Sequence, residues 1–82
     1  YTLGQKIENI ILEALELTLS ASYASIYKKE ILRKANGKTD LLKYLVRIAY
    51  ETGSIKIKNY ITLEEIILTI GRMIGGWQRS VK

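Results

Sequence analysis

The residues whose types and spacing point most clearly to chemistry are seven cations within a stretch of twenty residues. They are Lys28, Lys29, Arg33, Lys34, Lys38, Lys43 and Arg47. Several recur at the spacing of one helix face, and a row of cations along a helix suits the spaced phosphates of a nucleic-acid backbone. We therefore predict a nucleic-acid-binding surface with weak sequence preference and strong salt dependence. A charged face that serves only solubility is the alternative explanation.

The charge of the chain is unevenly distributed, with the positive charge in the middle and the C-terminal part. Its formal net charge is +5. Residues 1–25 carry one lysine against three glutamates, a net charge of −2, whereas residues 26–82 carry twelve lysines and arginines against five acids, a net charge of +7. A field of this sign attracts polyanions, and nucleic acid is the polyanion that fits best.

Catalysis and metal binding have little support in the sequence. The chain has no cysteine and no histidine, which excludes Cys/His zinc sites, disulfides, thiol nucleophiles and a Ser-His-Asp triad. Glu13 and Glu16 belong to a solvated helix stripe. Glu64 and Glu65 fall near the start of a predicted helix, where carboxylates complement the helix dipole. We predict no catalytic residue, no metal, no cofactor and no small-molecule substrate, so the protein is not expected to be an enzyme.

Five tyrosines lie among the cations. They are Tyr23, Tyr27, Tyr44, Tyr50 and Tyr60. Tyrosine rings can stack on unpaired bases. More often, tyrosines of helical proteins lie at the rim of a bundle with the ring packed and the hydroxyl in water, and we expect that arrangement here.

A second pattern is the glycine-rich segment IGRMIGGW at residues 70–77. In a helix, Gly71 and Gly75 lie one turn apart on one face, and each costs about 1 kcal/mol relative to alanine. Such a pair allows a second backbone to approach closely, and an arginine between the glycines is suited to cross a subunit interface. The predicted packing or oligomer-interface residues are Gly71, Arg72, Met73, Gly75, Gly76 and Trp77.

Three helices must position these residues, at about residues 2–24, 26–52 and 57–80. Thr2 and Gln5 form a capping box that begins the first, and Gly53 is suited to end the second. The Asn36-Gly37 pair is typical of a turn, but the apolar residues keep one helical phase on both sides of it, which predicts a continuous helix. We predict an all-α, antiparallel up-and-down bundle that forms a single domain over residues 1–82.

The first and third predicted helices have narrow polar faces. In the first, the polar line consists of Asn9, Glu13, Glu16 and Ser20, so most of the circumference favours burial. We therefore expect contacts with neighbours on two sides, from other copies of the chain or from a further helix before Tyr1. Charges interrupt every apolar run before membrane-spanning length, so no membrane contact is expected, and the absence of cysteine fits a reducing cytoplasm.

Four segments, taken in order, resemble a known family. They are YTLGQKIE at residues 1–8, RKAN at 33–36, LKYLVRIA at 42–49 and IGRMIGGW at 70–77. Together they resemble the accessory variability determinant proteins of diversity-generating retroelements, over essentially the whole chain. A looser Ile-Gly-Arg-Met form of the last segment also occurs in the related four-helix-bundle proteins encoded in intervening sequences of large-subunit ribosomal RNA genes.

The resemblance implies a four-helix bundle whose first helix would precede Tyr1. It also implies a basic, barrel-like pentamer without catalytic activity, which binds the element's reverse transcriptase and template RNA and is required for error-prone cDNA synthesis. Two alternatives remain open. One is an RNA-binding four-helix bundle without a polymerase partner, and the other is a purely structural, self-assembling helical bundle.

Overall fold

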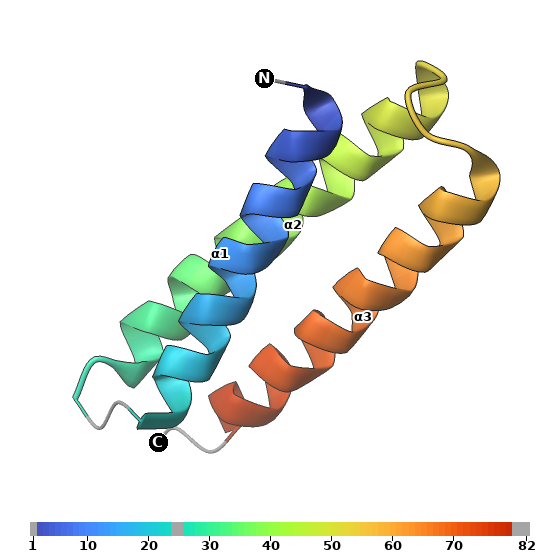
Figure 1. Ribbon diagram of the computed structural model, residues 1–82. Coiled ribbons are helices and arrows are strands. Elements are labelled where there is room, and N and C mark those ends of the chain that lie inside the picture. The colour runs from blue at the N-terminus through green and yellow to red at the C-terminus, as the bar shows by residue number, and fades with distance from the viewer. Residues whose placement is uncertain (1, 24–25, 80–82) are drawn as a thin grey trace.

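Three antiparallel helices make up the computed structural model, which describes residues 2–23 and 26–79. They are α1 (Leu3–Tyr23), α2 (Lys28–Glu51) and α3 (Ile57–Arg79), and in the view of Figure 1 they run down, up and down again. No strand occurs within those two ranges, so the all-α antiparallel prediction is confirmed. The observed helix ends lie within two residues of the predicted ones. The predicted ends at residues 24 and 80 lie outside the described residues.

The capping box at the start of α1 forms as predicted. The Thr2 amide donates a hydrogen bond to Gln5 Oε1 at 2.9 Å, and the Gln5 amide donates to Thr2 Oγ1 at 3.1 Å. Two amides that the helix itself cannot satisfy are thereby bonded, which fixes where α1 begins.

Helix α2 passes through Asn36-Gly37 without a break, as the phase of its apolar residues predicted. It ends where the backbone of Gly53 turns into the left-handed region, with φ of 77°. There the Gly53 amide donates to the Tyr50 carbonyl at 3.1 Å and the Ser54 amide to the Ala49 carbonyl at 2.8 Å. Glycine adopts this conformation without the steric cost that a Cβ imposes, so the predicted stop is confirmed.

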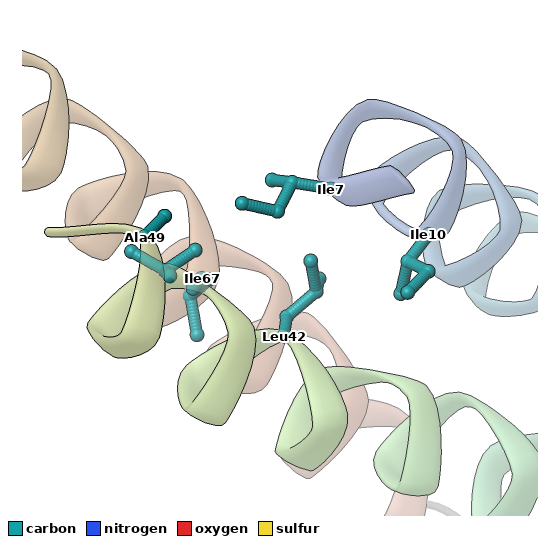
Figure 2. Packing of buried hydrophobic residues seen from close by; sticks show 6 residues of the cluster. Ile7, Ile10, Leu42, Ala49 and Ile67 are labelled. Atoms are coloured by element: carbon teal, nitrogen blue, oxygen red, sulfur yellow. The ribbon is translucent and has the colours of Figure 1, made fainter. Parts of the chain in front are cut away.

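The core consists of two clusters along the length of the bundle. One contains Ile7, Ile10, Leu42, Val46, Ala49 and Ile67, and the other contains Ala14, Ala21, Leu32, Ala35, Ile70 and Ile74. Figure 2 shows Ile7 and Ile10 projecting from α1 toward the helices that carry Leu42 and Ile67. Burial of these apolar faces, more than helix propensity, holds the three helices together.

Small and hydroxyl residues of α1 and α2 are also buried. They are Ala14 and Thr18 of α1 and Ala35 and Thr39 of α2. Thr18 Oγ1 donates to the Ala14 carbonyl at 2.7 Å, and Thr39 Oγ1 donates to the Ala35 carbonyl at 2.9 Å, so neither buried hydroxyl lacks a partner. Helix α1 packs most extensively on α2, whereas α3 packs mainly on α2 and little on α1.

Many large apolar side chains are left outside this core. Leu12 and Leu19 on α1 and Ile57, Ile61 and Leu68 on α3 are each more than half exposed. The molecule measures 42 × 23 × 15 Å along its principal axes. Within the described part of the chain, no helix is long and apolar enough to cross a membrane.

Candidate nucleic-acid interface

Four of the seven predicted cations share the outer side of α2. Lys29, Arg33, Lys43 and Arg47 are all exposed, and we call them the basic face. The single ion pair of this face among residues 2–23 and 26–79 joins Lys43 Nζ to Asp40 Oδ1 at 3.6 Å, between side chains that are 61% and 62% exposed. An exposed pair of this length is weak, so Lys43 stays available to an incoming anion.

The other three predicted cations point elsewhere. Lys38 Nζ lies 2.6 Å from Glu13 Oε2 and so bridges α2 to α1. Lys28 Nζ lies over the Trp77 ring, 4.7 Å from its centroid, which links the start of α2 to the end of α3. Lys34 lies with Lys38 at a groove between α1 and α2. The predicted set of seven is thus divided, and the basic face holds four of them.

The Glu13–Lys38 contact has an electrostatic consequence for the acid. The hydrogen bond from Lys38, together with its positive charge, holds the pKa of Glu13 below its ordinary value. Both side chains are partly exposed, at 39% for Lys38 and 48% for Glu13, so water screens the pair. The contact ties α1 to α2 without burying a charge.

A pocket of about 500 Å³ lies between α2 and α3 beside the basic face. Its lining residues are Asp40, Lys43, Tyr44, Arg47, Tyr60 and Glu64, and we call it the tyrosine pocket. Tyr60 is held by stacking on Tyr50, with ring centroids 4.5 Å apart and planes inclined by 15°. Tyr44 is 69% exposed at the pocket. Cations, carboxylates and an exposed ring therefore lie together at this point of the basic face.

The glycines of α3 line a second groove, of about 300 Å³, next to the tyrosine pocket. Its lining includes Gly71, Arg72, Gly75 and Arg79, and Lys43 lines both cavities. A Cβ built at Gly71 would meet nothing within 4 Å, and one at Gly75 would meet only the tip of Arg79 at 3.6 Å. No second backbone of the described chain makes the predicted close approach, so the role of this glycine face in an oligomer interface stays a prediction.

The remaining residues of the predicted interface set lie closer to the core. Trp77 packs against the cluster that contains Ile70 and Ile74. Met73 and Gly76 are half-buried, whereas Arg72 is exposed. Trp77 thus packs within the chain, and the part of the segment that remains open to a partner is the Gly71 side of α3.

The tyrosines only partly follow the expectation of packed rings at a bundle rim. Tyr50 and Tyr60 meet it, because they stack on each other. Tyr23 and Tyr27 are 89% and 68% exposed, and for these two and Tyr44 the expectation is wrong.

Sequence reasoning did not find the tyrosine pocket. Spacing placed Tyr60 and Glu64 on the third helix but could not place them opposite Asp40 and Arg47, because their position depends on how α2 and α3 are rotated against each other.

Metal coordination finds no support in the described residues, where no group of three or more Asp, Glu, His or Cys side chains is arranged to hold an ion. The described carboxylates are paired with lysines or spread along helix surfaces.

Comparison with protein families agrees with the resemblance seen in the sequence. The model of the family described as bAvd-like matches residues 1–81. No curated protein and no solved structure gave a significant match. The family match covers nearly the whole chain and all four segments on which the resemblance rests. The chain therefore belongs to the bAvd-like family, that of proteins like the accessory variability determinant.

Proposed function

We propose that this chain is a non-catalytic accessory protein of a diversity-generating retroelement, which binds template RNA or its cDNA and docks the element's reverse transcriptase. Membership of the bAvd-like family supports the retroelement role. The observation that carries the nucleic-acid part is the basic face, which consists of four exposed cations along one side of α2. Of these four, only Lys43 makes an ion pair with a described residue, and that pair is weak. Cations arranged in this way attract a phosphate backbone with little dependence on sequence.

The proposal includes assembly into a homo-oligomer, a pentamer by the resemblance. Support comes from the apolar side chains that the core leaves exposed on both α1 and α3, Leu12 and Leu68 among them. Apolar surface of this extent on an 82-residue chain favours burial against further copies. A ring of copies would repeat the basic face and multiply its field. A cytoplasmic location is part of the same proposal, because template RNA and reverse transcriptase act there.

Charge reversal tests the nucleic-acid part directly. We expect Arg33→Glu, Lys43→Glu and Arg47→Glu together to weaken binding of a labelled single-stranded RNA about 100-fold or more at low salt, measured by fluorescence anisotropy. The matched control reverses three exposed lysines elsewhere, Lys6, Lys56 and Lys58, and changes the net charge equally. Circular dichroism verifies that both variants remain helical. Unchanged RNA binding by the first variant, or equal loss in both, would contradict the assignment of the basic face.

The polymerase partner needs a separate experiment, since the basic face would serve an RNA binder without such a partner equally well. We expect the chain to co-purify, after nuclease treatment, with the reverse transcriptase of the proposed retroelement. RNA binding without co-purification would favour the RNA-binding alternative. If the chain showed no RNA binding and no co-purification, the purely structural, self-assembling bundle would be favoured. The exposed apolar residues are the observation that supports this alternative.

A further inference from the structure

We infer that the tyrosine pocket binds an unpaired nucleotide, with the base against Tyr44 and the phosphate at Arg47, so that the protein prefers single-stranded to duplex RNA. The inference rests on the proposed function, because it names the form of nucleic acid that the basic face takes. Its starting point is that one pocket brings together groups for both halves of a nucleotide.

The first argument is the charge of the lining. Lys43 and Arg47 are balanced by Asp40 and Glu64, so the pocket has no formal net charge. A site for phosphate alone would be weakened by two carboxylates. A nucleotide instead offers a phosphate to the cations and exocyclic amino groups to the carboxylates, which act as acceptors when ionised. In an RNA duplex the amino groups of adenine and cytosine are paired, and their free edges lie in a deep, narrow major groove that side chains cannot read, so the carboxylates would face mainly phosphates.

The second argument is the arrangement of the rings. Tyr60 is fixed by its stacking on Tyr50 at 4.5 Å and forms one side of the pocket. Tyr44 is 69% exposed, so most of its ring is in water. A base that stacks on an exposed ring removes apolar surface of both partners from water, and this is how single-stranded nucleic acid is commonly held. A volume of about 500 Å³ lies within the range of small-ligand sites.

The third argument is continuity with neighbouring cations. Lys43 and Arg47 line the tyrosine pocket and also belong to the basic face, which continues along α2 to Arg33 and Lys29. A strand whose base lies in the tyrosine pocket therefore meets the remaining cations of the basic face along α2. Phosphates flanking the bound nucleotide would be attracted there, which gives the strand a path along α2.

The experiment compares two probes and three variants by fluorescence anisotropy. The probes are a labelled oligoadenylate of about 10 nucleotides and a blunt RNA duplex of the same length. The variants are Tyr44→Ala, Tyr44→Phe, which keeps the ring, and Tyr27→Ala, a control of nearly equal exposure, 68%, outside the pocket. Tyr27 makes no side-chain capping bond to α2, so its truncation removes only an exposed ring.

We expect the oligoadenylate to bind more tightly than the duplex. Tyr44→Ala should weaken oligoadenylate binding about fivefold or more, with the duplex unaffected and the salt dependence unchanged, because a stacking contact is lost and no charge. Tyr44→Phe and Tyr27→Ala should bind as the parent does. Equal binding of both probes, or a Tyr44→Ala variant without a selective loss, would overturn the inference while the proposed function stands. Failure of both probes to bind at low salt would overturn both.

Discussion

At the scale of single residues, the contact between Glu13 and Lys38 shows that one cation of the predicted nucleic-acid-binding surface contributes to packing instead. Lys38 lies on α2 four residues after Lys34, and the sequence alone placed both with the nucleic-acid surface. The 2.6 Å contact with Glu13 instead makes Lys38 part of the α1–α2 packing. The complementary residue was visible in the sequence, but the pairing was not, since it depends on which turn of α1 faces which turn of α2.

This ion pair predicts a small dependence of stability on acid. The folded-state pKa of Glu13 is lowered, so the stabilisation is present above the ordinary carboxyl pKa and is lost as pH falls through the lowered value. The difference in thermal midpoint between the parent and Glu13→Gln should therefore be largest near neutral pH and vanish in acid. Glu16→Gln is the control on the same helix. A difference that grows as pH falls would contradict this account of the pair.

At the scale of elements, the sequence predicted most of the helical structure because the local signals agreed. The capping box, the apolar phase and Gly53 each fixed a boundary or a continuity that the structure shows. At Asn36-Gly37 two signals disagreed, and the phase of the buried residues prevailed. Burial of Leu32, Ala35 and Leu42 on the same side of α2 outweighs the local preference of an Asn-Gly pair for a turn.

Gly37 within α2 and Gly53 just after its end predict opposite effects of the same substitution. A Cβ at Gly37 would meet nothing within 4 Å, so Gly37→Ala should raise the free energy of unfolding by about 1 kcal/mol through helix propensity. Gly53 has φ of 77°, where a Cβ is strained, so Gly53→Ala should lower the free energy of unfolding by about 1 kcal/mol. Chemical denaturation measures both. Destabilisation by Gly37→Ala would mean that its surface is covered in the assembled protein.

The arrangement of α2 against α3 marks the limit of sequence reasoning at this scale. Spacing along α2 correctly brought Lys43 and Arg47 to one exposed side, and spacing along α3 placed Tyr60 and Glu64 one turn apart. Their meeting in one pocket depends on the rotation of each helix about its axis, which the core residues of both helices decide jointly. A candidate site within one helix was therefore predictable, whereas a site shared between helices was not.

At the scale of the whole molecule, the three described helices leave large apolar side chains on the surface. Leu12 and Leu19 of α1 and Ile57, Ile61 and Leu68 of α3 remain more than half exposed although the three helices pack on one another. Gly71 points in the same direction. A Cβ at this position would meet nothing within 4 Å, so the cost of the glycine to the helix has no packing reason within the described chain.

Assembly is the prediction that belongs to this scale. Light scattering should give a mass several times that of the 9.4 kDa chain. Gly71→Leu should reduce that mass while leaving the helical circular dichroism signal intact, because the added side chain meets open space within the chain and a neighbour only in the assembly. Gln78→Leu, another exposed position of α3, is the control. A parent protein that stays monomeric would contradict the account of the apolar surface.

The central claim is that the basic face binds nucleic acid, and the salt dependence of RNA affinity tests it most directly. Single-stranded binding loses about 0.7 in the logarithm of affinity per tenfold increase in salt for each phosphate neutralised, so the four cations of one copy predict a slope of about −3 or steeper. The variant reversed at Arg33, Lys43 and Arg47 should give a nearly flat line, and the variant reversed at Lys6, Lys56 and Lys58 should retain the steep one. A flat line for the parent protein, or equal slopes for the two variants, would contradict the claim.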